Sequence, residues 1–194
     1  MSDQPPEPPI LSPAASTHRA VRAAFVSFAE HEYHSLKVFL LRCGASHEDS
    51  EDAAQEAFID AWRLLINHPS RWIAVREPRA WIRTVALRAL ARPRGQRRRQ
   101  ILTIPLDLDQ PGHDRVSSDW TEQVALESDV RAALQALPWD QRLAMAYRLD
   151  DFTHAAIADQ LGMTEQQVRD LVKRARAALK IYLQIHSFGE KDPQ

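Results

Sequence analysis

Residues 153–179 read THAAIADQLGMTEQQVRDLVKRARAAL, and this stretch decides the fold of the second half of the chain. Thr153 and Thr164 each stand before a helical pattern as N-cap candidates, and Gly162 lies between the two patterns as a turn residue. Gln167 follows Thr164 at the spacing of a capping box. A short helix, a glycine turn and a capped second helix predict a helix-turn-helix unit.

The second helix of such a unit lies in the DNA major groove, with its N-terminal residues at the base edges. Glutamine can pair with adenine, and arginine with guanine, through two hydrogen bonds, so the first glutamines and arginine of this helix are predicted base readers. Its later basic residues suit phosphate contacts. The predicted DNA-contacting set is Thr164, Gln166, Gln167, Arg169, Lys173, Arg174 and Arg176. The alternative interpretation is a helical hairpin with a solvated basic face.

The rest of the chain also has helical patterns. Glycine occurs only five times in 194 residues, and alanine and leucine are abundant, which favours helices over strands. Ser46 and Asp49 form a second predicted capping box. Apolar stripes at helical spacing run over residues 17–43, 46–65 and 78–92 and again from residue 138. Residues 66–77 are expected to form a loop with room for one short turn.

Prolines and charged residues divide these helices into two groups. The predicted organisation is a disordered proline-rich tail over 1–17, a first domain over 18–99, an acidic linker over 100–121, a helix-turn-helix domain over 122–186 and a tail over 187–194. The predicted fold class is therefore all-α, with two small helical domains joined by an extended linker.

The sequence argues against several other classes of protein. Its single cysteine, Cys43, excludes an intramolecular disulfide and multi-cysteine metal sites. His31 and His34 flank Glu32, but a zinc hydrolase of this kind needs histidines four positions apart, so we predict no metal and no cofactor. The sequence has no phosphate-binding loop, dinucleotide fingerprint or nucleophile elbow, which predicts that the chain is not an enzyme. No apolar run approaches the ~20 residues that span a membrane, so we expect no membrane insertion.

Two further blocks complete a larger pattern. Residues 50–62 read SEDAAQEAFIDAW, residues 78–86 read PRAWIRTVA, and residues 137–142, which precede the helix-turn-helix, read LPWDQR. In this order and spacing the blocks resemble bacterial RNA polymerase sigma factors of the sigma-70 family, in particular the small extracytoplasmic-function (ECF) type. The resemblance extends over most of residues 20–183.

The resemblance implies three binding surfaces. The first domain would bind core RNA polymerase through one face of its second helix, namely Asp52, Gln55, Glu56, Ile59 and Asp60. It would meet the promoter −10 element through Arg79, Arg83, Arg88 and Arg92 and through the loop residues Asn67, His68 and Arg71. The helix-turn-helix would read the −35 element.

The resemblance also implies partners and a place in the cell. We expect a chain that is monomeric when free, binds promoter DNA together with polymerase and is held inactive by an anti-sigma protein. It would be cytoplasmic, and nucleoid-associated when active. The net charge of −1 conceals a first domain of +6 over residues 18–100 and a segment of −4 over residues 101–123. With so little net attraction, stable promoter binding should require polymerase.

Three alternatives stay open at the level of sequence. Asp170, Leu171 and Pro93 depart from the family pattern, which leaves room for a sigma-like regulator, or decoy, that binds a protein partner without reading a promoter. A plain helix-turn-helix repressor, usually a dimer, is the second alternative, and a metallohydrolase is the third. Binding to core polymerase and promoter-specific transcription separate the first two from a sigma factor, and metal analysis tests the third.

Overall fold

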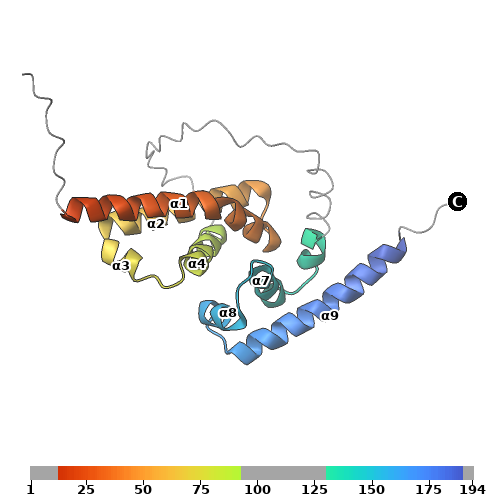
Figure 1. Ribbon diagram of the computed structural model, residues 1–194. Coiled ribbons are helices and arrows are strands. Elements are labelled where there is room, and N and C mark those ends of the chain that lie inside the picture. The colour runs from red at the N-terminus through yellow and green to blue at the C-terminus, as the bar shows by residue number, and fades with distance from the viewer. Residues whose placement is uncertain (1–12, 93–129, 190–194) are drawn as a thin grey trace, which may run out of the picture.

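The computed structural model describes residues 13–92 and 130–189, and within these ranges it consists of helices and turns without a strand. The helices are α1 (Pro13–Arg42), α2 (His47–Asn67), α3 (Pro69–Ile73), α4 (Pro78–Ala91), α7 (Trp139–Arg148), α8 (His154–Leu161) and α9 (Glu165–Gly189). A further helical stretch over residues 130–135 precedes α7. The predicted all-α class is confirmed (Figure 1).

The predicted helix ends form as the sequence indicates. The Ser46 side chain accepts a hydrogen bond of 3.0 Å from the Asp49 backbone N–H and so caps α2. Thr153 caps α8 in the same way, through the Ala156 N–H at 3.1 Å. Gly162 ends α8 in the left-handed conformation, with φ of 65°, which a glycine adopts without steric cost.

Three boundaries differ from the prediction. The first helix begins at Pro13, inside the predicted tail of residues 1–17, and the expected loop over 66–77 contains α3. Helix α9 continues to Gly189, beyond the predicted start of the second tail at residue 187. Proline fits the first turn of a helix because its fixed φ is helical and its missing N–H would have no partner there, and α3 also starts with a proline. The predicted linker, residues 100–121, lies outside the described residues, as do residues 1–12 and 190–194 of the predicted tails.

The first helical unit consists of α1–α4 and has an aromatic cluster at one end. The Phe25 ring lies 5.4 Å from Trp62 and 5.2 Å from Trp72, and Trp72 meets Trp81 edge-on at 5.9 Å. Tilted and edge-on ring pairs of this kind add to the free energy gained by burying the rings. Trp72 and Trp81 are therefore part of the packing of this unit.

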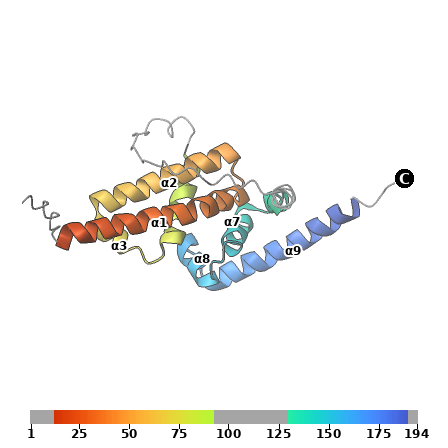
Figure 2. The ribbon, with the colours of Figure 1, turned by 45° about the horizontal axis from the view of Figure 1, so that its top comes forward.

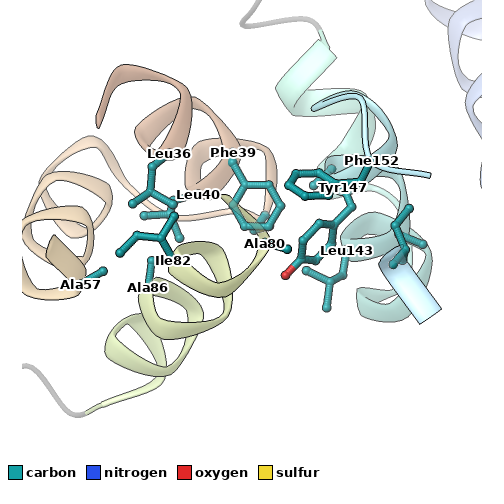
Figure 3. Packing of buried hydrophobic residues seen from close by; sticks show 14 of the residues in the cluster. Leu36, Phe39, Leu40, Ala57, Ala80, Ile82, Ala86, Leu143, Tyr147 and Phe152 are labelled. Atoms are coloured by element: carbon teal, nitrogen blue, oxygen red, sulfur yellow. The ribbon is translucent and has the colours of Figure 1, made fainter. Parts of the chain in front are cut away.

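The second helical unit, residues 130–189, packs directly on the first. Helix α1 contacts α7, and helix α4 contacts α8. We call these contacts, together with those that residues 130–137 make with the first unit, the interdomain interface. The rings of Phe39 and Tyr147 meet there at 4.8 Å (Figure 3). Both views show α9 running along one edge and extending beyond the rest of the described helices (Figures 1 and 2). The two predicted domains thus share one continuous hydrophobic core.

Gly44 makes part of this interface possible. Its φ is 102°, a conformation that side chains rarely adopt, and an added Cβ would lie 2.8 Å from Nη1 of Arg142 in the second unit. Arg142 is itself fixed, because it donates to the Leu134, Gln135 and Leu137 carbonyls at 2.7–3.0 Å. A glycine is needed at this turn both for its backbone and for the approach of the second unit.

We expect the free energy of unfolding to fall as the pH rises above about 9. Burial raises the pKa of the Cys43 thiol from 9.0 to about 12 and that of Tyr147 from 10.0 to about 12. Both groups therefore lose their protons in the unfolded chain before they do so in the folded chain, which favours unfolding at alkaline pH. Urea titrations between pH 7 and pH 11 measure this slope. In a Cys43→Ala variant the free energy of unfolding should fall less steeply with pH. An equal dependence on pH in both proteins would contradict a contribution from the buried Cys43 thiol.

Candidate nucleic-acid interface

The turn before α9 places the predicted reading helix at the surface. Val168, Val172 and Ala175 form its buried stripe, which packs on α7 and α8. Thr164 and Gln167 cap the helix reciprocally: the Thr164 N–H donates to Gln167 Oε1 at 2.7 Å, and the Gln167 N–H donates to Thr164 Oγ1 at 3.2 Å. Every residue of the predicted DNA-contacting set of this helix is exposed, namely Thr164, Gln166, Gln167, Arg169, Lys173, Arg174 and Arg176.

Acidic neighbours on α9 hold two of the predicted base readers. Arg169 forms an ion pair with Glu165, and Nε2 of Gln166 donates to Asp170 Oδ1 at 3.2 Å. Exposed pairs of this kind contribute little free energy and exchange readily with other partners. Thr164 and Gln167 have a structural role already, as the cap. Of the predicted base readers, Gln166 and Arg169 are thus the two that take no part in the cap.

The four arginines predicted to meet the −10 element lie in different surroundings. Arg88 is exposed on α4. Arg79 is half-exposed and forms an ion pair of 2.8 Å with Glu32, and Arg92 forms an ion pair with Glu56. Arg83 is completely buried. In the arrangement that the structure shows, Arg83 is therefore enclosed by protein and cannot contact DNA.

Arg83 is the centre of a buried polar cluster in the interdomain interface. Its Nε donates to Asp150 Oδ2, its Nη2 to Glu32 Oε2 at 3.1 Å and to Ser35 Oγ at 3.0 Å, and its Nη1 to the Arg79 carbonyl at 2.7 Å. The guanidinium also lies 5.1 Å from the ring centroid of Phe152. The cluster pairs one buried cation with two carboxylates, as burial of charge requires. Sequence reasoning missed Glu32 and Asp150, because only the tertiary fold brings them to Arg83.

The loop residues predicted to face the −10 element are exposed at the junction of α2 and α3. Asn67 ends α2, and the His68 carbonyl accepts from the Arg71 backbone N–H at 2.9 Å. All three residues are exposed to solvent. They form an accessible polar corner beside Trp72.

The predicted polymerase-binding face of α2 is partly accessible. Asp52 and Gln55 are exposed, whereas Glu56, Ile59 and Asp60 are half-buried. Glu56 pairs with Arg92, and Asp60 pairs with Arg63 at 3.3 Å. The buried side of the same helix consists largely of alanines and Phe58, which explains how α2 packs closely while this face stays polar.

The histidines near the start of the chain do not assemble a metal site. His31 Nδ1 lies 2.6 Å from the Ser27 carbonyl. Among residues 13–92 and 130–189, no group of three or more His, Cys, Asp or Glu side chains could hold a metal ion. None of the helices within those two ranges is long and apolar enough to cross a membrane.

Comparison with known proteins finds similarity in sequence over both units. Residues 128–179 match the family model "Sigma-70, region 4". The chain is 28% identical over 161 residues to "ECF RNA polymerase sigma factor SigE" of Mycolicibacterium smegmatis, an alignment that covers 79% of this chain and 60% of the relative. It is 32% identical over 139 residues to "Probable RNA polymerase sigma factor RfaY" of Xanthomonas campestris pv. campestris, covering 68% of this chain and 33% of the relative. The chain thus spans less than two thirds of each relative's length.

Two solved structures have a similar fold. One is CnrH in complex with the cytosolic domain of CnrY, with a TM-score of 0.61, 20% identity, and coverage of 89% of this chain and 95% of the other. The other is the sigma factor RpoE of Bartonella quintana in complex with the anti-sigma factor NepR, with a TM-score of 0.59, 20% identity, and coverage of 84% and 98%. Both similarities extend over the two helical units, so the arrangement of helices as a whole is a known fold.

Proposed function

We propose that this chain is a sigma factor of the ECF group of the sigma-70 family, which directs RNA polymerase to particular promoters and initiates transcription there. The observation that carries the proposal is the position of α9. The region 4 match covers a helix-turn-helix whose second helix is capped and presents its polar and basic residues to solvent. Such a helix is suited to enter the major groove of a promoter.

The remaining surfaces have complementary roles in this proposal. The face of α2 around Asp52 and Gln55 binds core polymerase, and α4 with the Asn67–Arg71 corner meets the −10 element. An anti-sigma protein binds the chain and holds it inactive; the similar structure from Bartonella quintana is a complex of a sigma factor with an anti-sigma factor. The chain contributes binding and no chemistry of its own, and it works in the cytoplasm and on the nucleoid, where polymerase is.

Reconstituted transcription tests the proposal. The full chain is mixed with core RNA polymerase from its own or a related bacterium and with a fragmented genomic library, and the transcripts are sequenced. A sigma factor yields 5′ ends that share upstream motifs and disappear when the chain is omitted. Polymerase binding without such transcripts would favour the regulator that binds a protein partner, and a dimer without polymerase binding would favour the repressor.

Charge reversal on α2 should remove polymerase binding. We expect the double variant Asp52→Lys with Gln55→Lys to bind core polymerase at least about tenfold more weakly, because a basic patch replaces an acidic and polar one. Fluorescence anisotropy of the labelled chain measures the affinity. The matched control is His47→Lys with Glu48→Lys, which makes a similar change of charge at the exposed start of the same helix. Equal weakening in both variants would contradict a specific role of the Asp52 face.

A further inference from the structure

Asp170 lies in the middle of the face of α9 that is turned away from the protein. The buried stripe of this helix has intervals of four and three residues and consists of Val168, Val172 and Ala175. Gln166, Asp170 and Lys173 have the same intervals two positions earlier, and two residues turn an α-helix by slightly more than half a turn. These three residues therefore lie opposite the buried stripe, and all three are exposed. DNA that receives the start of α9 has to face the Asp170 carboxylate.

This carboxylate has no basic partner. Its Oδ1 accepts a hydrogen bond of 3.2 Å from Nε2 of Gln166. Arg174 reaches Asp170 only at the backbone carbonyl, to which its Nε donates at 3.3 Å. Within the described part of the chain Asp170 forms no ion pair, whereas Glu165 pairs with Arg169. Asp170 thus places an uncompensated negative charge in the centre of the predicted DNA-contacting face.

We propose that Asp170 determines sequence specificity at the start of α9. Together with Gln166 it requires an exocyclic amino group, N6 of adenine or N4 of cytosine, on the base that it meets in the major groove. The inference rests on the proposed function, and it adds to the DNA-contacting face a residue that the predicted set does not contain. Leu171, the neighbouring departure from the family pattern, is buried in the core, so this role falls to Asp170 alone.

The chemistry of the base edges sets this requirement. In the major groove adenine N6 and cytosine N4 are hydrogen-bond donors, whereas guanine and thymine present acceptors there. An ionised carboxylate can only accept. Opposite an amino group it gains a charge-assisted hydrogen bond, and opposite guanine or thymine it loses its water without replacement. Asp170 therefore favours adenine or cytosine at one position of one strand, largely by rejecting the other two bases.

The hydrogen bond to Gln166 acts in the same direction. A glutamine that reads adenine uses its amide oxygen to accept from N6 and its amide nitrogen to donate to N7. Here the amide nitrogen faces Asp170, since two acceptors would repel each other, and the carboxylate competes with N7 for this donor. The Gln166 amide oxygen and Asp170 Oδ2 then remain as acceptors for the DNA. The pair is exposed and can exchange partners, but the carboxylate has to exchange its donor for another donor.

The hold of Asp170 on Gln166 can be measured in the free chain. We expect nuclear Overhauser contacts between the side-chain amide protons of Gln166 and the methylene protons of Asp170 in the full chain. The same contacts should persist in Glu165→Ala, which removes the neighbouring pair on the helix. Their absence from the unmodified chain would overturn the part of the proposal in which Asp170 positions Gln166.

Promoter fragments with altered bases test the requirement for an amino group. The complex of the full chain with core polymerase first selects its preferred −35 sequence. Each adenine of that element is then replaced by purine and each cytosine by 2-pyrimidinone, so that the amino group alone is lost. We expect one replacement to lower the affinity by at least about tenfold, and the analogue that does so identifies adenine or cytosine as the base. In Asp170→Ala the same replacement should cost less than about twofold. Weaker base pairing in the analogues affects both chains alike and cancels in this comparison.

Glu165→Ala is the matched control for this experiment. It removes a second exposed carboxylate from the same helix and so changes the charge equally, but it releases Arg169 and leaves Gln166 held. Glu165→Ala should therefore keep the full dependence on the amino group. The proposal is overturned if no analogue lowers the affinity, or if the loss stays the same in Asp170→Ala. A complex that selects no DNA sequence at all would overturn the proposed function and the role of Asp170 with it, whereas a selected sequence without amino-group dependence would overturn the role of Asp170 alone.

Discussion

Replacing Arg83 by methionine is expected to lower the free energy of unfolding by about 3–5 kcal/mol. The substitution keeps most of the buried volume and removes the charge. Asp150, whose side chain is only 8% exposed, would lose its cationic partner, while Glu32 would keep Arg79. An unpaired buried carboxylate must either gain a proton or reach water, and both are costly at neutral pH. Urea unfolding followed by circular dichroism measures the loss. The dependence of the unfolding free energy on urea concentration is compared between the two proteins, because an equal dependence shows that only the stability has changed.

Two further variants identify the cause of that loss. Arg79→Met removes a half-exposed partner of the same Glu32 and should cost no more than about 1 kcal/mol. The double variant Arg83→Met with Asp150→Asn removes both buried charges and should recover part of the stability. A loss below about 1 kcal/mol in Arg83→Met would mean that water reaches Asp150 readily, which is inconsistent with the burial found here.

The local features of this fold were predictable because they depend on residues that are close in the sequence. The Ser46, Thr153 and Thr164 caps each use a hydrogen bond that spans three residues, and Gly162 needs no partner outside its own turn. The segment that contains α3 was expected to be a loop with room for one short turn, because five residues give too short an apolar pattern to identify a helix. Its packing comes from Trp72, whose ring partners lie on α1 and α4.

The interdomain interface could not be predicted in the same way. Arg83 and Asp150 are 67 positions apart, and no periodicity connects them. On α4 alone, Arg83 resembles Arg79 and Arg88, and all three suit phosphate contacts equally well. Only the position of the second unit distinguishes them, because it covers one and leaves the others accessible. Sequence therefore identified the candidate DNA-binding residues as a group, and the tertiary structure divides the group into an exposed and an enclosed part.

The exposed candidate residues on α9 give the second prediction with a large expected effect, a loss of affinity for promoter DNA. We expect Arg169→Ala to lower the affinity of the polymerase complex for its preferred −35 sequence by about 10–100-fold and to relax specificity at one base pair, as loss of a two-hydrogen-bond contact with guanine would. Lys173→Ala should weaken binding to all sequences alike and reduce the salt dependence by about one counterion, because a phosphate contact carries no sequence information. Selection of DNA by the unmodified complex first defines the preferred sequence. Binding of single-base variants at several salt concentrations then separates the two roles.

Glu165 makes the Arg169 prediction more specific. In the free chain Glu165 holds Arg169 on the surface of α9, so DNA has to replace one partner of the arginine by another. Glu165→Gln should therefore leave specificity in place and raise affinity slightly, because the competing carboxylate and its repulsion of phosphate are both removed. Lys180→Ala, a change of charge on the exposed side of the same helix outside the predicted DNA-contacting set, is the control. If Arg169→Ala and Lys180→Ala weakened binding equally and without regard to sequence, Arg169 would be a general electrostatic contact, and base reading at the start of α9 would have to depend on Gln166.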